Sequence, residues 1–97
     1  MNPFPPAKLD DMPVLQYAVL SNDATPTGNT KHLFNGQPVK DITRLAVCDG
    51  GGNPKAIYLF SCDDDWNVLT DTCHMSIEEA LAQADFEYQH IRSAWKS

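Results

Sequence analysis

Four oxygen-bearing side chains in the second half of the chain have the spacing of positions 1, 3, 5 and 9 of a calcium-binding loop: Asp63, Asp65, Asn67 and Asp71. Carboxylate and amide oxygens are the ligands that calcium prefers. Such a loop also needs Gly at position 6 and a bidentate Glu at position 12, but this chain has Val68 and His74 there. We therefore expect a structural turn at this place and no calcium site.

Thiols and imidazoles are the second group of possible metal ligands: His32, Cys48, Cys62, Cys73 and His74. Structural zinc sites use close cysteine pairs, whereas the only close pair here is Cys73-His74. Successive side chains of a strand point to opposite faces, so these two cannot share one ion. We expect a pair of buried thiols on neighbouring strands, an exposed His74 before the last helix, and no metal or cofactor.

Cys73 and His74 also form the best hint of an enzyme, because they precede a helix that is predicted to begin at Ser76. A thiol near a helix N-terminus can be activated as a nucleophile. However, the chain contains no Gly-x-Ser-x-Gly, Gly-x-Gly-x-x-Gly or P-loop motif, and its small size leaves little room for a deep pocket. The glycines 50–52 are interpreted as a hairpin tip. We expect no catalytic residues.

The charge of the chain narrows its possible partners. The formal net charge is −6, and the seven Lys and Arg residues form no run, so we exclude nucleic acid as a direct partner. No apolar stretch approaches the about 18 residues of a membrane span, and the start of the chain lacks the features of a signal peptide. We expect a cytoplasmic protein with no membrane contact and with reduced thiols.

The last helix is the best-specified element of the sequence. Ser76 followed by Glu79 matches a capping box, which predicts a helix beginning at Ser76. Apolar residues then recur at steps of three and four over about five turns: Ile77, Ala80, Leu81, Ala84, Tyr88, Ile91 and Trp95. Phe86 falls on the opposite, polar side of this helix with Gln83 and His90. We expect Phe86 to face outward or to lie beneath the start of the chain, through Phe4 and Leu9.

The remaining elements are predicted to be strands. Val14–Leu20, Ile42–Cys48, Lys55–Cys62 and Trp66–Thr72 are rich in residues that favour strands and are bounded by turn formers. Residues 21–30 are predicted to be a loop, and a small hairpin is expected around Asn35-Gly36, with Pro38 weakening its second strand.

These elements define one domain of the α+β class. We expect a two-layer fold in which an antiparallel sheet of about four to five strands carries the C-terminal amphipathic helix on one face. Four prolines lie within residues 1–13, which are therefore predicted to be a proline-rich N-terminal arm without secondary structure. Residues 14–97 form the single α+β domain.

Two segments of the C-terminal half resemble a group of small uncharacterised bacterial proteins. They run from Tyr58 to Thr72 (YLFSCDDDWNVLTDT) and from Ser76 to Tyr88 (SIEEALAQADFEY). The resemblance covers about the last forty residues. It implies a bacterial, cytoplasmic protein that ends in two strands and a helix, and it carries over no activity and no site residue.

The leading functional hypothesis is a small acidic protein-binding module of the adaptor, inhibitor or immunity type. Its surface would consist of Phe86, His90, Asp63, Asp64 and Asp65, with the carboxylates steering a basic partner and the aromatic ring anchoring it. A homodimer formed through sheet edges or the outer helix face, with no separate partner, is the second hypothesis. An enzyme or metal protein that depends on Cys73 and His74 is the third.

Overall fold

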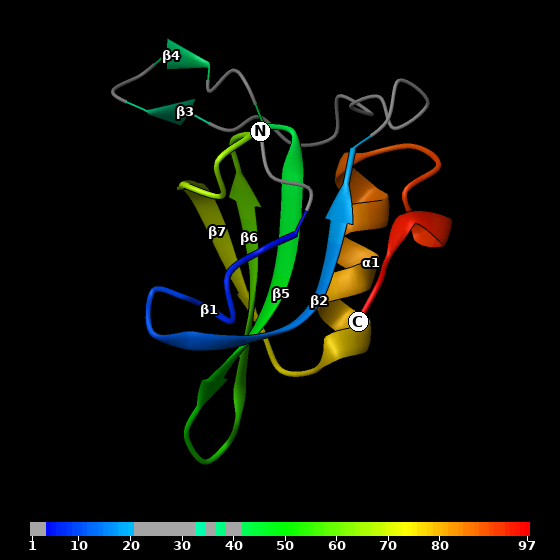
Figure 1. The fold of residues 1–97 in the computed structure, drawn as a ribbon. Coiled ribbons are helices and arrows are strands. Elements are labelled where there is room, and N and C mark those ends of the chain that lie inside the picture. Colours follow the sequence, from blue (N-terminus) through cyan, green and yellow to red (C-terminus); the bar gives the residue numbers. More distant parts are fainter. Residues whose placement is uncertain (1–3, 21–32, 35–36, 39–41) are drawn as a thin grey trace.

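The computed structural model describes residues 4–20, 33–34, 37–38 and 42–97. One antiparallel sheet has the strand order β1-β2-β5-β6-β7 (Figure 1). Its strands are β1 (Lys8–Leu9), β2 (Met12–Val19), β5 (Arg44–Gly51), β6 (Ala56–Cys62) and β7 (Val68–His74). A separate pair is formed by β3 (Leu33–Phe34) and β4 (Gln37–Pro38). The helix α1 (Ile77–Glu87) and the 3₁₀ helix η1 (Arg92–Ala94) follow. The predicted α+β class is confirmed.

One face of the sheet is covered by α1, which contacts β5, β6 and β7. Odd-numbered residues of β5 and β6, such as Leu45 and Leu59, point to this side because side chains alternate along a strand. They pack against the apolar stripe of the helix, whose fully or partly buried members are those predicted from the sequence. We call this group the helix-side cluster. The predicted helix stripe on one face of the sheet is therefore confirmed.

The other face of the sheet is also buried. Its core consists of Leu9, Ala46, Cys48, Phe60, Cys62 and Trp66, which we call the hairpin-side cluster. The β1–β2 hairpin crosses this face (Figure 1), and β2 has an irregular register between Val14 and Gln16 that accompanies its bend. Because both faces are covered, β6 is apolar along nearly its whole length and β5 is buried from Arg44 to Cys48.

The predicted arm contains secondary structure. Lys8 pairs with Pro13 and Leu9 with Met12, so the expectation that residues 1–13 hold no strand is wrong over residues 8–13. Leu9 is only 6% exposed and lies in the hairpin-side cluster. It therefore does not cover Phe86, which projects from the helix on the other side of the sheet.

The last strand begins two residues later than predicted. Trp66 has a positive φ of 65°, which places it in the turn before β7, although its side chain is buried in the hairpin-side cluster. The amides of Asp65 and Asn67 both donate to Asp63 Oδ1, so the turn extends as far as Asn67. The alternation of side chains indicated the strand correctly but could not show how far the turn continues.

The helix ends well before Trp95. The amide of Tyr88 donates to the carbonyl of Ala84 over 2.8 Å, and Tyr88 itself has an extended backbone. A helix continuing to Trp95 would be about 28 Å long, whereas a seven-residue strand spans about 23 Å. The chain turns back at His90, whose φ is 59°, and Ile91 and Trp95 still pack in the helix-side cluster. The prediction of five helical turns is wrong, but the predicted burial of the stripe is correct.

Several predictions fall outside the described residues. They are the loop at residues 21–30, the Asn35-Gly36 turn and the position of His32. On either side of that turn, Leu33 pairs with Pro38 and Phe34 with Gln37. The predicted hairpin is thus present as a short antiparallel pair.

Candidate functional site

The helix that carries Phe86 has a well-defined start. Ser76 is the N-cap and its Oγ accepts a hydrogen bond from the amide of Glu79 over 3.1 Å. The Glu79 carboxylate accepts in return from the amide of Met75 over 3.3 Å. These local bonds satisfy amides that have no partner within the helix. The predicted helix start at Ser76 is confirmed.

Phe86 lies on the solvent side of this helix and its side chain is 51% exposed. The neighbouring Asp85 accepts hydrogen bonds from Arg92 Nε and Nη2, and Arg92 Nη1 also lies 3.6 Å from Glu78. Arg92 therefore joins η1 to the outer side of α1. The result is an exposed aromatic ring on a helix whose two ends are both tied down.

His90 is exposed and lies two residues beyond the C-cap Tyr88. Its left-handed backbone reverses the chain after the helix, and the segment that follows returns to β2. His90 therefore follows Phe86 closely along the chain but belongs to the turn after the helix.

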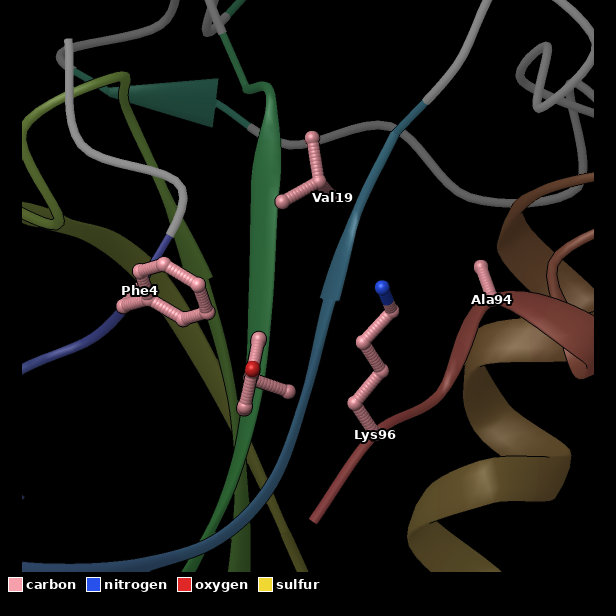
Figure 2. Close-up of a pocket in the computed structure, with 5 residues that line it drawn as sticks. Phe4, Val19, Ala94 and Lys96 are labelled. Atoms are coloured by element: carbon pink, nitrogen blue, oxygen red, sulfur yellow. The ribbon is translucent and has the colours of Figure 1, made fainter.

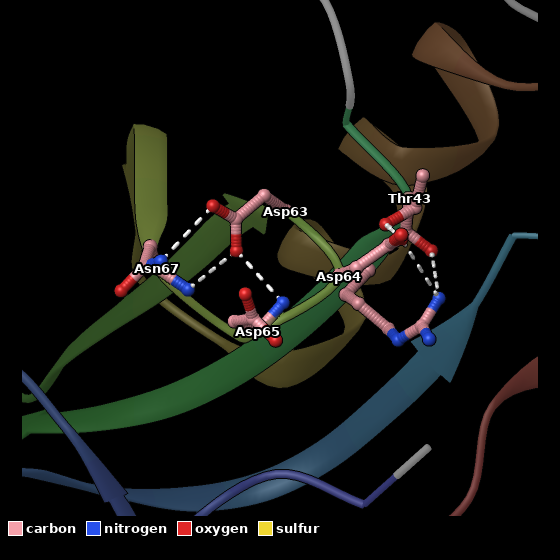
Figure 3. Close-up of polar contacts among 6 residues, drawn as sticks. Thr43, Asp63, Asp64, Asp65 and Asn67 are labelled. Carbon is pink, nitrogen blue, oxygen red and sulfur yellow. Dashed lines mark hydrogen bonds and ion pairs between the residues drawn. The ribbon is translucent and has the colours of Figure 1, made fainter. Parts of the chain in front are cut away.

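Asp63 is engaged in its own turn (Figure 3). Its Oδ1 accepts from the amides of Asp65 and Asn67, and its Oδ2 accepts from Asn67 Nδ2, over 2.9 to 3.0 Å. These hydrogen bonds, first of all that from the Asn67 side chain, hold the pKa of Asp63 below its ordinary value. The carboxylate thus stabilises the β6–β7 turn, as expected for a structural turn.

Asp64 points toward Thr43, which directly precedes β5 and whose Oγ1 donates to Asp64 Oδ1 over 2.5 Å (Figure 3). Arg44 Nη1 lies 3.8 Å from the same oxygen, and the Arg44 side chain is only 6% exposed. Arg44 is not among the site residues predicted from the sequence. The available signal was a charged residue at the head of an apolar strand, since a buried guanidinium needs an acidic or carbonyl partner.

Asp65 differs from its two neighbours because it is exposed and its bond within the turn is made by its backbone amide. Of the three predicted carboxylates, Asp63 is used by the turn and Asp64, half exposed at 49%, faces Thr43. Asp65 is therefore the carboxylate of this turn that is available to a partner.

The structure places the two halves of the predicted surface at one end of the molecule. The β6–β7 turn lies at the end of the sheet layer, and the C-terminal end of α1 lies at the same end of the helix layer (Figure 1). The hydrogen bonds and ion pair of the Asp63–Asp65 turn are made with Thr43, Arg44 and Asn67. Phe86 and the carboxylates are thus parts of two layers, and only a partner that spans both would contact them together.

Cys73 and His74 point to opposite sides of β7. Cys73 is exposed and lies opposite Tyr58, and a hydrogen bond between these two side chains raises the pKa of Tyr58. His74 lies opposite Ile57, and its Nε2 is 2.7 Å from Thr72 Oγ1. His74 is half buried, so the prediction of an exposed histidine is wrong. Because the two side chains lie on opposite faces of β7, His74 is not placed to accept the proton of Cys73, as a nucleophile and its base require.

The other two thiols are buried in the hairpin-side cluster, Cys48 on β5 and Cys62 on the neighbouring β6. Burial raises the pKa of each to about 12. The predicted pair of buried thiols on neighbouring strands is confirmed. Within the described ranges, no three His, Cys, Asp or Glu residues are grouped so that they could hold a metal ion.

No family model matches the chain, and no curated protein or solved structure matches it either. The resemblance of residues 58–72 and 76–88 to small bacterial proteins therefore stays a prediction. No helix in the described part of the chain is long and apolar enough to cross a membrane.

Proposed function

We propose that this domain is a protein-binding module whose helix α1 presents Phe86 to a basic partner. The observation that carries the proposal is the 51% exposure of the Phe86 side chain on the solvent side of a fixed helix. Large aromatic side chains are enriched among the residues that contribute most to protein interfaces. The exposed Glu78 and Asp85 on this side both pair with Arg92, so the preference for a basic partner is supported mainly by the net charge of −6.

Rigidity of the helix supports the same proposal. The Ser76 cap and the Arg92 ion pairs hold both ends of α1, and its inner side is buried at Ala80, Leu81 and Ala84. A partner would therefore meet a surface that is already formed, and little conformational entropy would be lost on binding.

The β6–β7 turn offers fewer carboxylates to a partner than the sequence indicated. Because Asp63 stabilises its own turn and Asp64 faces Thr43, a partner would be attracted mainly by Asp65 and by the overall charge of −6. The electrostatic field of these negative charges accelerates association with a basic partner, and salt weakens this effect. We infer that Phe86 determines the lifetime of the complex and that the charges determine how fast it forms.

The test compares Phe86→Ala with Met75→Ala. Both side chains are apolar and exposed, Met75 at 67%, but Met75 precedes the helix whereas Phe86 lies near its other end. Wild type and both variants are immobilised, a lysate is passed over them, and bound proteins are quantified by mass spectrometry. We expect Phe86→Ala to lose a basic partner that wild type and Met75→Ala retain.

The partner is then purified and its binding kinetics are measured. We expect Asp65→Asn to lower the association rate, with an effect that shrinks as salt is raised, and to leave the dissociation rate unchanged. If Phe86→Ala captured the same proteins as wild type in the same amounts, the outer side of α1 would not be the binding surface.

A homodimer is the second candidate, because β7 is an edge strand of the five-stranded sheet. A second copy could pair along this edge, although exposed Asp71 is the kind of residue that discourages such pairing. Sedimentation velocity at micromolar concentration distinguishes the two candidates, since a monomer would contradict the homodimer. A bacterial, cytoplasmic setting is likewise proposed, supported by the resemblance of the last forty residues.

A further inference from the structure

A concave surface lies along the outer edge of β2 and does not include Phe86. It is a pocket of about 330 Å³ lined by Phe4, Tyr17, Val19, Ala94 and Lys96 (Figure 2). This volume lies at the lower end of the range of small-molecule sites, about 300 to 1,000 Å³. The lining residues come from the start of the chain, from β2 and from the C-terminal segment.

The edge of β2 is only partly paired in this region. The amide of Tyr17 donates to the carbonyl of Lys96 over 2.9 Å, and the amide of Lys96 donates to the carbonyl of Tyr17 over 2.8 Å. Backbone groups of successive strand residues point alternately to the two sides of the strand. The amide of Leu20 donates to Thr43 on the β5 side, so Val19 turns its amide and carbonyl to the outer side, as Tyr17 does.

The C-terminal segment does not continue along Val19. Residues Arg92–Ala94 form η1, which takes the chain away from β2 immediately before Lys96. No described residue pairs with the outer backbone groups of Val19. With no backbone partner among the described residues, the amide of Val19 can donate to a bound molecule.

Most of the pocket surface is apolar. The rings of Phe4 and Tyr17 meet edge to face, with centroids 6.4 Å apart and an interplanar angle of 71°. Val19 and Ala94 add aliphatic groups, and Phe4 and Val19 are 63% and 36% exposed. These side chains could be covered by a short hydrocarbon chain or an aromatic ring.

The charged group of the pocket is the ammonium of Lys96. Figure 2 shows the Lys96 side chain extending from the C-terminal segment beside β2, with its nitrogen directed toward the region between Val19 and Ala94. Within the described part of the chain, no carboxylate lies within ion-pair distance of this nitrogen. This cation stands out on a protein whose net charge is −6.

We propose that this pocket binds a small monocarboxylate with an apolar chain or ring. The apolar part would lie against Phe4, Tyr17, Val19 and Ala94, and the carboxylate would pair with Lys96 and accept from the amide of Val19. The Lys96 ammonium can attract a carboxylate although the protein is negatively charged overall. Charges farther away than about 8 Å are largely screened at physiological salt. A cationic or a neutral ligand would have no negatively charged group to pair with Lys96.

The test is a titration of the ¹⁵N-labelled full chain with octanoate, octanol and octylamine, followed by amide chemical shifts. These probes share a chain length and differ in the head group. We expect octanoate to bind in the range of about 0.1 to 1 mM, as its size allows, and to shift Val19 and Lys96. Octanol should bind more weakly, and octylamine should give no shift at these positions.

Lys96→Met keeps the length of the side chain and removes its charge. We expect it to weaken octanoate binding about fivefold, the size of a partly exposed ion pair, and to leave octanol binding unchanged. Lys55→Met is the control, because Lys55 pairs with Asp49 at the β5–β6 end of the sheet and should not affect either ligand. Unchanged dispersion of the spectrum shows that each variant folds.

Three results would overturn the proposal. Equal binding of octanoate and octanol would show an apolar surface without charge selection. Shifts at Val19 and Lys96 on adding a capped apolar tetrapeptide, with none from octanoate, would assign the edge of β2 to strand addition. The absence of shifts with every probe would show that the pocket binds no such ligand. None of these results bears on Phe86.

Discussion

The two faces of the sheet are buried to a similar degree but by different means. On the helix side, Leu45, Val47 and Leu59 are covered by an amphipathic helix whose stripe is visible in the sequence. On the hairpin side, Ala46, Cys48 and Phe60 are covered by Leu9 and Trp66, which come from a short hairpin and a turn. The comparison shows that a strand buried on both faces need not be covered twice by regular elements.

The difference has a consequence for local stability. The helix-side cover is a capped helix of 11 residues, whereas β1 has two residues and pairs with β2 at two positions. Segments with few buried contacts and few backbone hydrogen bonds open more readily than the core. We therefore expect the hairpin side to open first.

The largest effect is expected from Phe60→Ala in β6. Phe60 is 2% exposed at the centre of the hairpin-side cluster, and removing a buried aromatic ring costs about 3–5 kcal/mol. Urea denaturation measures this loss, with Leu45→Ala as the counterpart on the helix side, for which about 2–5 kcal/mol is expected. A loss below about 1 kcal/mol for Phe60→Ala would mean that the hairpin-side cluster is no true core.

Leu9→Ala tests the β1–β2 hairpin that covers the hairpin-side cluster, whereas Phe60→Ala tests the sheet itself. Because Leu9 is 6% exposed, we expect a loss of about 2 kcal/mol, at the lower end for a buried leucine since the hairpin can settle. Met75→Ala, which removes an exposed side chain outside both clusters, should change stability by less than about 0.5 kcal/mol. Equal effects of the two substitutions would argue that the hairpin does not stabilise the fold.

Thiol labelling follows opening of the hairpin side directly. Cys73 is exposed, whereas Cys48 and Cys62 are buried and their pKa values are raised to about 12. At pH 8 we expect Ellman's reagent to react quickly with Cys73 alone, because the other two thiols are buried and their raised pKa values keep them from forming the reactive thiolate. Leu9→Ala should speed the labelling of Cys48 and Cys62 more than Leu81→Ala does at matched stability. Faster labelling of these two thiols in Leu81→Ala than in Leu9→Ala would mean that the helix side opens more readily than the hairpin side.

Ser76→Ala is expected to have a smaller effect. The Ser76 hydroxyl accepts from the amide of Glu79, and loss of such a cap costs about 1 kcal/mol. Ser93→Ala is the matched control, because Ser93 is exposed in η1 and provides no cap. Thermal unfolding of both variants gives the comparison, and a silent Ser76→Ala would show that packing alone determines where α1 begins.

The smallest effect is expected for Asp63→Asn and depends on pH. The pKa of Asp63 is lower in the folded chain than in the unfolded chain, so its stabilisation is present above the ordinary value of about 3.9 and is lost as pH falls through the lower, folded value. The difference in Tm between wild type and Asp63→Asn should therefore be larger at pH 7 than at pH 3. Asp65→Asn, which removes an exposed carboxylate of the same turn, is the control variant.

Much of the candidate surface could be predicted because its features are local. Phe86 faces outward since the helix period places it opposite Ile77, and both the helix start and this period depend on residues within a few positions of one another. The role of Asp64 was not predictable. Asp64 meets Thr43 from 21 residues away, and no spacing in the sequence brings these two together.

The sequence by itself determined the α+β class, the runs that became β2, β5, β6 and β7, and the helix start at Ser76, because each depends on neighbours along the chain. Tertiary structure alone decided where the helix ends, since burial of Ile91 and Trp95 and the pairing of Lys96 with Tyr17 require the chain to turn back. It also decided that Leu9 and Trp66 close the second face and that a pocket remains at the edge of β2. These features join residues far apart in the chain, and only folding brings such residues into contact.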